Sequence, residues 1–281
     1  MKVRLFGVLV AAALMVLAAP PASASFSGEY LALGDSVAFG FNPNLVPSQA
    51  SNPGVFVGYP DIVAQRLGLQ LTNASCPGET SGGFISTTNG QDYRCLAYRF
   101  FFPLHVQYPG AQLAFALQFL STHSDVQLVT MDIGANDVFK LETDICNMDA
   151  TCIQNGLPAV LTGIDLNLRF IYAELRNVAH YQGLVVTLNY YSLLYDEASE
   201  TATQALNFPI GDATTANGGI IASGFDAFEA RAEAHANSSC AAGLLIINLT
   251  TGVCDVHPSP LGRDALAGAI VRAVEQVTPS A

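Results

Sequence analysis

The sequence predicts an α/β fold, a three-layer α/β/α sandwich in which helices cover both faces of a parallel sheet of about five strands. Short apolar segments, typical of strands buried on both faces, alternate with longer segments of helical periodicity. Strands that are separated by helices pair in parallel through right-handed crossovers. The chain has no internal repeat and no low-complexity linker, so we expect residues 25–281 to form one domain.

The strands are predicted where apolar residues run together and stop at a turn, as in EYLAL at 29–33 and VQLVTMDIG at 126–134. The first helix ends at Gly68, a common helix stop. From Pro158 onward, apolar residues recur at spacings of three and four, which indicates an amphipathic helix. In chain order we predict a strand at 29–33, a helix at 58–68, strands at 69–73 and 126–134, a helix at 158–178, a strand at 183–191, a helix at 225–236, a strand at 243–249 and a helix at 261–277.

Three segments fit no regular element: 41–57, 82–110 and 192–222. The first is rich in proline, the second contains RFFFPLHVQY, and the third is polar and rich in glycine. Long irregular connections inside a compact domain are usually functional or mobile. We therefore expect them to surround a substrate cleft, although 192–222 fits a plain surface loop almost as well.

The first residues have the layout of a secretory signal peptide. Lys2 and Arg4 precede an apolar run at 5–17, and Ala-Ser-Ala at 22–24 is a small-residue cleavage site. We expect residues 1–24 to be removed and the mature protein to be secreted. No other long apolar segment follows, so we expect no stable membrane anchor.

The charge of the chain excludes some partners. Its formal net charge is −12, which disfavours binding to phosphate backbones, so we expect no nucleic acid. It equally argues against attraction to an anionic membrane surface. We expect a monomer that binds an ester substrate.

Six cysteines in an exported chain predict disulfides and not metal ligands. No Cys-x-x-Cys pair occurs, and no histidine lies at a metal-ligand spacing from two cysteines, so we expect no metal. Six cysteines allow 15 connectivities. Pairing of nearest neighbours closes three short local loops, and we therefore predict Cys76–Cys95, Cys146–Cys152 and Cys240–Cys254.

Polar or glycine-rich turns follow the predicted strands, and such turns converge at one edge of a parallel sheet. The residues in these turns have complementary chemistry: a serine (Ser36), a glycine (Gly78), an asparagine (Asn136) and a histidine (His257). A serine hydroxyl needs a base within hydrogen-bonding reach to become a nucleophile, and His257 can be that base. The amides of Ser36, Gly78 and Asn136 can stabilise an oxyanion. The competing interpretation is that Asp35 or Ser36 only caps a helix.

Together these turns resemble the sequence blocks of the GDSL/SGNH hydrolase family. The blocks are Gly-Asp-Ser at 34–36, Pro-Gly-Glu-Thr-Ser at 77–81, Gly-Ala-Asn-Asp at 134–137 and His-Pro at 257–258. The match spans essentially the whole mature chain in the family's order. The resemblance implies a flavodoxin-like sandwich and ester hydrolysis through an acyl-enzyme, without a cofactor. It also implies that Ser36 is the nucleophile, that Gly78 and Asn136 complete the oxyanion hole, and that His257 is the base.

One position departs from the family pattern. The family usually places its acid three residues before the histidine, where this chain has Cys254, and Asp255 lies only two residues before His257. Either Asp255 reaches the imidazole, or a backbone carbonyl near Cys254 orients the ring, or the protein is catalytically weak. Some secreted members with three disulfides use such a carbonyl, and on that resemblance we favour the carbonyl slightly.

The substrate is left open by the sequence. An ester of a lipid, an acetylated polysaccharide, a phospholipid and an acyl-thioester are all compatible with the motifs. A catalytically inactive module that binds surface ligands is the alternative from another class, favoured only by the missing acid. The remaining histidines have no motif around them, and we expect them to be surface residues: His105, His123, His180 and His235.

Overall fold

The computed structural model describes residues 27–88 and 94–278. The predicted signal peptide lies outside this part of the chain. The central sheet has five strands in the order β2-β1-β3-β4-β5, and every neighbouring pair is parallel. The strands are β1 (Glu29–Gly34), β2 (Gln70–Asn73), β3 (Val126–Asp132), β4 (Leu184–Leu188) and β5 (Ile220–Ala222). The predicted fold class is therefore confirmed.

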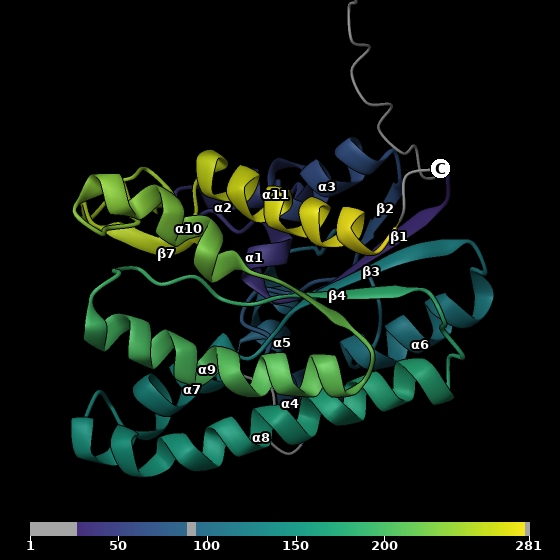
Figure 1. Cartoon of the computed structure of the whole chain (residues 1–281), viewed down its shortest axis with the longest axis horizontal. Helices are drawn as coiled ribbons and strands as arrows, with labels where there is room; N and C mark the ends of the chain where they lie inside the picture. Colours follow the sequence, from purple (N-terminus) through teal and green to yellow (C-terminus); the bar gives the residue numbers. More distant parts are fainter. Residues whose placement is uncertain (1–26, 89–93, 279–281) are drawn as a thin grey trace, which may run out of the picture.

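Helices cover both faces of this sheet, as Figure 1 shows, with α3 and α11 on one side and α6, α8 and α9 on the other. The α-helices are α1 (Ser36–Phe39), α2 (Pro47–Ala50), α3 (Tyr59–Leu67), α4 (Ser81–Ile85), α5 (Cys95–Phe101), α6 (Gln112–Thr122), α7 (Ala135–Lys140), α8 (Ala150–Asn177), α9 (Glu197–Ala216), α10 (Gly224–Ala232) and α11 (Pro260–Val277). None of the helices in 27–88 and 94–278 is long and apolar enough to cross a membrane.

The strand order determines where a site can form. The chain passes from β1 to β2 on one side and then returns to β3 on the other side of β1. In open parallel sheets, a crevice opens outside the carboxyl ends of the strands where the order reverses. The turn after β1 and the turn after β3 meet at this reversal.

The fifth strand was assigned to the wrong segment. Residues 243–249 do not join the main sheet, because β6 (Leu245–Ile247) pairs antiparallel with β7 (Cys254–Pro258) in a separate hairpin. The fifth strand is β5, which lies in the segment 192–222 that was expected to be irregular. A strand of three residues is too short to show a period-two pattern in the sequence.

The same segment contains α9, a helix of 20 residues that the sequence analysis missed. Asp196 caps it, because its side chain accepts a hydrogen bond from the Ser199 N–H at 2.8 Å. Pro209 and Gly211 lie inside this helix, although proline and glycine disfavour helix formation. The sequence pattern therefore did not predict α9. The helix α8 likewise begins at Ala150, before Pro158, behind an Asp149 cap.

All three predicted disulfides are present: Cys76–Cys95, Cys146–Cys152 and Cys240–Cys254. The first ties the loop after β2 to the start of α5. The third ties the segment before β6 to the first residue of β7. The first bond therefore fixes the segment that follows the carboxyl end of β2, and the third fixes the start of the strand that carries His257.

Candidate active site

Three of the four residues predicted to act together line a single cavity of about 440 Å³. Ser36 follows β1, Asn136 lies in the first turn of α7 after β3, and His257 lies on β7. The serine and the histidine are 221 positions apart in sequence, and the two sheets bring them to the same hollow. The convergence expected from the strand ends therefore holds for Ser36 and Asn136, whereas His257 reaches the cavity from the separate hairpin.

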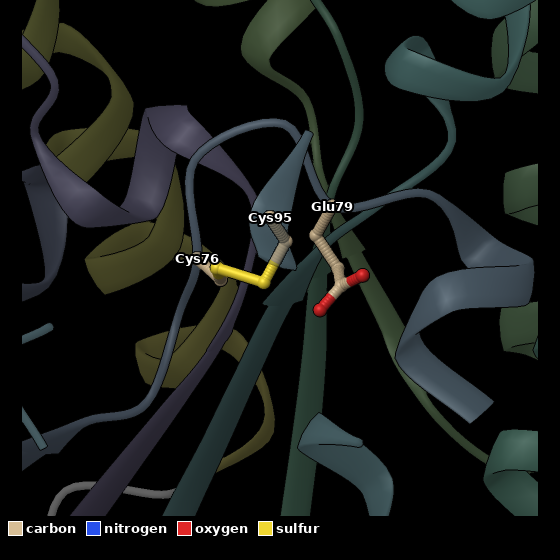
Figure 2. A group of neighbouring side chains, drawn as sticks. All are labelled: Cys76, Glu79 and Cys95. Atoms are coloured by element: carbon tan, nitrogen blue, oxygen red, sulfur yellow. A yellow bond between two sulfur atoms is a disulfide. The ribbon is translucent and has the colours of Figure 1, made fainter. Parts of the chain in front are cut away.

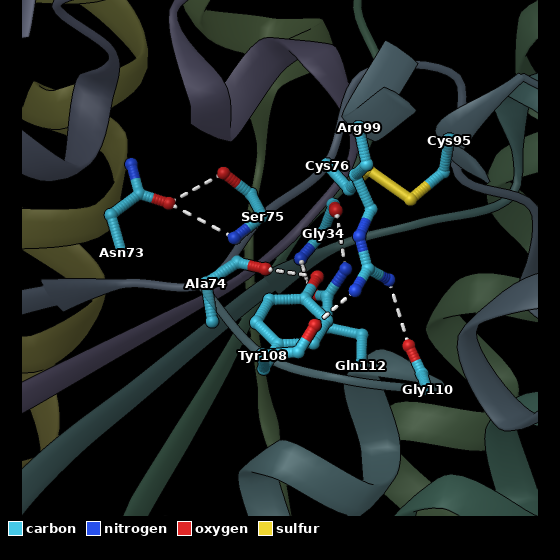
Figure 3. The surroundings of a disulfide bond; sticks show 10 residues. All are labelled: Gly34, Asn73, Ala74, Ser75, Cys76, Cys95, Arg99, Tyr108, Gly110 and Gln112. Atoms are coloured by element: carbon cyan, nitrogen blue, oxygen red, sulfur yellow. Dashed lines mark hydrogen bonds between the residues drawn. A yellow bond between two sulfur atoms is a disulfide. The ribbon is translucent and has the colours of Figure 1, made fainter. Parts of the chain in front are cut away.

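The turn before Ser36 is rigidly held. The carboxylate of Asp35 caps α1 by accepting the Val37 N–H at 2.9 Å, so the predicted capping role belongs to Asp35 and leaves the Ser36 side chain out of the cap. The buried side chain of Gln112, on α6, makes two hydrogen bonds to the backbone of Gly34 (Figure 3). Its Oε1 accepts the Gly34 N–H at 2.6 Å, and its Nε2 donates to the Gly34 carbonyl at 3.0 Å. Gly34 has a φ of 133° and a Cβ there would lie 2.5 Å from Asp132 Oδ1. Glycine is therefore required at this position.

Two buried carboxyl groups, Asp35 and Asp132, lie next to the turn that carries Ser36. Asp35 accepts hydrogen bonds from the Tyr190 hydroxyl at 2.6 Å and from Asn136 Nδ2 at 3.2 Å. Asp132 accepts from the Tyr59 hydroxyl at 2.8 Å and from the Ala38 N–H at 3.3 Å. Burial raises the pKa of Asp35, and burial together with the charge of Asp35 raises the pKa of Asp132 well above its usual range. The pair therefore holds on to a proton at pH values where exposed aspartates have lost theirs.

The side-chain amide of Asn136 is oriented by Asp35. An amide nitrogen carries two hydrogens, and the bond to Asp35 uses one of them. Asn136 is buried and lines the cavity next to Ser36. The geometry is suited to presenting an N–H donor toward a group bound at Ser36.

Gly78 differs from the other predicted residues, because it is not among those that line the cavity. It adopts a left-handed φ of 79°, and a Cβ there would come within 2.5 Å of the Arg94 side chain. Its turn is nevertheless tied to the site. Asp137, next to Asn136, accepts the Ser81 N–H at 2.8 Å and the Ser81 hydroxyl at 2.7 Å. Burial raises the pKa of Asp137 to about 6, against the lowering effect of these two hydrogen bonds.

The imidazole of His257 contacts a carboxylate and not a carbonyl. Nδ1 of His257 lies against Asp255 Oδ1, which also accepts the His257 backbone N–H at 3.0 Å. The slight preference for a carbonyl near Cys254 is therefore not what the structure shows. The reason is local: both residues lie on β7, and side chains two positions apart in a strand point to the same face. A spacing of two thus places an acid beside the histidine.

The electrostatics of this pair favour a charged aspartate. Partial burial opposes ionisation of Asp255, but the hydrogen bonds and the charge of His257 outweigh it, so the pKa of Asp255 is lowered. The position of the ring is fixed on two sides. The Phe41 ring packs against it with centroids 4.8 Å apart, and the Tyr191 hydroxyl holds the strand by donating to the Val256 carbonyl at 2.6 Å.

The other histidines lie outside the cavity lining. His105 hydrogen-bonds the Phe39 carbonyl at 3.1 Å, and His123 and His235 bond backbone carbonyls one turn back in their own helical segments. The structure also places Cys76, Glu79 and Cys95 together (Figure 2), with candidate ligand atoms within 4.8 Å of one another. The two sulfurs form a disulfide, which removes the thiolates that a metal would need.

The cavity extends from Ser36 into an apolar groove between α7, α8 and α9. Its walls are partly exposed aliphatic and aromatic side chains: Val138, Phe139, Ile153, Leu157, Leu161 and Leu206. The polar residues of the cavity lie mainly around Ser36 and His257. Glu142 also lines the cavity, and burial raises the pKa of its carboxyl group. This groove can hold an apolar group of a molecule that is bound at Ser36.

Sequence reasoning missed several residues that organise the site. Gln112, Asp132 and Tyr190 contact the Gly34–Asp35 turn from elements far away in the chain. Buried polar side chains in apolar surroundings are the available signal, since Asp132 ends an apolar strand. The signal does not reveal which residue the side chain contacts.

An α/β sandwich in which a serine, an amide and a histidine paired with a carboxylate meet at one cavity is typical of hydrolytic enzymes. The fold is shared with solved structures. An extracellular lipase from Streptomyces rimosus is 18% identical, with a TM-score of 0.57, over 88% of this chain and 99% of its own. A phospholipase A1 from Streptomyces albidoflavus is 17% identical, with a TM-score of 0.56, over 89% and 99%. An acetylxylan esterase from Geobacillus stearothermophilus is 17% identical, with a TM-score of 0.53, over 90% and 96%.

The sequence model of the GDSL-like lipase/acylhydrolase family matches residues 32–265. The chain therefore belongs to the GDSL-like lipase/acylhydrolase family, and it is a carboxylic ester hydrolase. No curated protein sequence matches the chain. The likeness to the solved structures, all below 20% identity, is one of fold.

Proposed function

We propose that the protein is a serine esterase or lipase that cleaves carboxylic esters through an acyl-enzyme on Ser36. The observation that carries this proposal is that Ser36, Asn136 and His257 line one cavity while Asp255 contacts the imidazole. Family membership supplies the reaction class, and the geometry supports these residues for it.

The reaction follows from the groups around the cavity. Nε2 of His257 takes the proton of the Ser36 hydroxyl as its oxygen attacks the acyl carbonyl. The Asp255 carboxylate holds the ring through Nδ1 and stabilises the imidazolium. The Ser36 N–H and the Asn136 amide stabilise the oxyanion, with the Gly78 N–H as the third donor that the family pattern implies. The imidazolium then protonates the leaving alcohol, and water activated by His257 releases the acid.

The apolar groove supports an acyl chain as the group that binds beyond the carbonyl. The cavity that contains the groove has a volume of about 440 Å³, in the range of pockets that enclose ligands of drug size. The six large apolar side chains named above and three alanines, all on α7, α8 and α9, line the groove. An acetyl group on a sugar would leave most of this surface in contact with water. We therefore favour esters of apolar acids over acetylated polysaccharides.

An inactive binding module is disfavoured by the Asp255 contact, since its main support was the missing acid. The test is hydrolysis of a soluble aryl ester by the Ser36→Ala variant, with Ser121→Ala as the control on an exposed serine of α6 outside the cavity lining. We expect turnover to fall at least about 10³-fold in Ser36→Ala and to persist in Ser121→Ala. Turnover in Ser36→Ala equal to that of the parent would exclude this nucleophile.

We also propose that the protein is exported. Three disulfides support this, because such bonds form and persist in oxidising compartments. The signal-like layout of residues 1–24 is the second support. N-terminal sequencing of protein from the culture medium tests it: we expect cleavage after Ala24, and retention of an intact N-terminus inside the cells would contradict it.

A further inference from the structure

The rim beside the candidate site carries exposed aliphatic side chains. Leu249 is 81% exposed, Val253 65%, Ile247 54% and Val46 52%. We call these four residues the apolar rim. It borders the reacting groups, because the loop that leads to Val46 begins at Phe41, whose ring packs on His257, and the hairpin β6–β7 carries His257 itself. Figure 1 shows this hairpin at the left end of the molecule, with β7 labelled.

Hydrogen bonds to the backbone fix the two chain segments that carry the apolar rim. The Asn44 side chain joins the two segments: Nδ2 donates to the Ile247 carbonyl at 2.8 Å, and Oδ1 accepts the Leu249 N–H at 2.8 Å. Within the hairpin, the Asn248 N–H donates to the Val253 carbonyl at 2.9 Å. The Cys240–Cys254 disulfide closes the base. The aliphatic side chains are therefore presented to solvent by a fixed backbone.

The two chain segments that carry the rim contain no charged residue. Residues 36–60 and 236–254 contain no aspartate, glutamate, lysine or arginine, in a chain whose formal net charge is −12. A charged side chain would have to lose its hydration to enter an apolar phase, and that is costly. Acidic side chains would also be repelled by anionic lipids. An uncharged aliphatic surface next to an ester hydrolase site fits contact with a lipid–water interface.

We propose that the apolar rim docks the enzyme on the surface of aggregated ester lipid, so that a substrate molecule passes from that surface directly to Ser36. The delivery of substrate to Ser36 rests on the proposed function, whereas binding of the rim to a lipid surface can be measured without hydrolysis. A second copy of the chain is the weaker candidate. A stable protein interface takes about 20–30 residues on each side, and the rim offers four aliphatic side chains.

Binding to vesicles of zwitterionic phosphatidylcholine tests the proposal directly. Ser36→Ala serves as the parent so that hydrolysis does not consume the vesicles, and it is compared with Ser36→Ala carrying Leu249→Asp. The matched control carries Phe208→Asp, because Phe208 is 75% exposed on α9 and lies outside both the rim and the cavity lining. The protein is made in a host that does not glycosylate, since Asn248-Leu249-Thr250 is a glycosylation sequence.

We expect the parent to co-sediment with vesicles, Leu249→Asp to weaken partitioning at least about tenfold, and Phe208→Asp to leave it unchanged. Failure of the parent to bind, or equal weakening by both substitutions, would overturn the proposal. A dimer that Leu249→Asp dissociates, without vesicle binding, would assign the rim to a second copy and would equally overturn it. Turnover of a soluble aryl ester by the Leu249→Asp single variant is measured separately. If no variant with an intact Ser36 hydrolyses that ester, the proposed function fails, whatever the vesicles show.

Discussion

Replacing Asp255 by asparagine isolates the charge of the residue that contacts His257. Asparagine keeps an oxygen that can accept the His257 backbone N–H, a bond of 3.0 Å in the parent, so the local strand geometry is retained. What is lost is the negative charge beside Nδ1, which is largely shielded from solvent. Two unit charges about 4 Å apart interact by about 4 kcal/mol at an effective dielectric constant of about 20.

A loss of about 4 kcal/mol in the transition state lowers kcat about 10³-fold. A further decrease, toward about 10⁴-fold, is expected if the asparagine amide reverses the tautomer of the imidazole. The assay is steady-state hydrolysis of a soluble aryl ester, with thermal unfolding measured in parallel. The control is Asp226→Asn, which neutralises an exposed carboxylate on α10.

We expect Asp255→Asn to lose most of its kcat while it still unfolds in one cooperative transition, with a melting temperature lowered by the lost ion pair, and Asp226→Asn to lose almost no kcat. A kcat for Asp255→Asn within tenfold of the parent would refute the reasoning. Some other group, such as a backbone carbonyl near Cys254, would then orient the ring.

Three further predictions follow from the contacts of the site. The pKa of Asp137 is about 6 in the folded protein, against an ordinary value of 3.8, so the protonated carboxyl contributes to the free energy of unfolding in full below pH 3.8. This contribution, about 3 kcal/mol, is lost as the pH rises through 6. Urea unfolding of Asp137→Asn between pH 4 and 7 should lack this loss, and a pH dependence identical to that of the parent would contradict the prediction. Gln112→Leu leaves the buried Gly34 N–H without its acceptor and should lower the free energy of unfolding by about 1–3 kcal/mol. Gln118→Leu, on the exposed face of α6, should lower it little. Equal effects of the two substitutions would contradict a stabilising role for the hydrogen bonds between Gln112 and Gly34. Ala205→Phe fills the part of the groove where about three methylenes of an acyl chain would bind. The kcat/KM for octanoyl esters should therefore fall about 30- to 100-fold relative to that for acetyl esters. An equal decrease for both esters would argue against binding of the acyl chain in this groove.

The positions of two cavity-lining residues could be predicted because they follow segments where apolar runs stop. Ser36 and Asn136 each follow a long buried strand, β1 or β3, and parallel strands bring such positions together. The three disulfides could be predicted because each closes a local loop. Both inferences depend only on short-range patterns.

The remaining features depend on long-range contacts or on local conformation. The hydrogen bond between Gln112 and Gly34 joins residues 78 positions apart, and no sequence pattern in either segment predicts this contact. The partner of His257 depends on backbone conformation, because a spacing of two brings Asp255 to the ring only in an extended strand. The helix α9 was missed because Pro209 and Gly211 oppose helix formation locally, while packing against α8 stabilises it.

The most direct test of the catalytic arrangement is mass spectrometry of the protein after treatment with a fluorophosphonate, which labels only an activated serine. We predict one adduct, mapped to the peptide that contains Ser36, with a labelling rate that falls at least about 10²-fold in His257→Gln. An adduct on another serine, or the same labelling rate in His257→Gln, would contradict the claim that this histidine activates this serine.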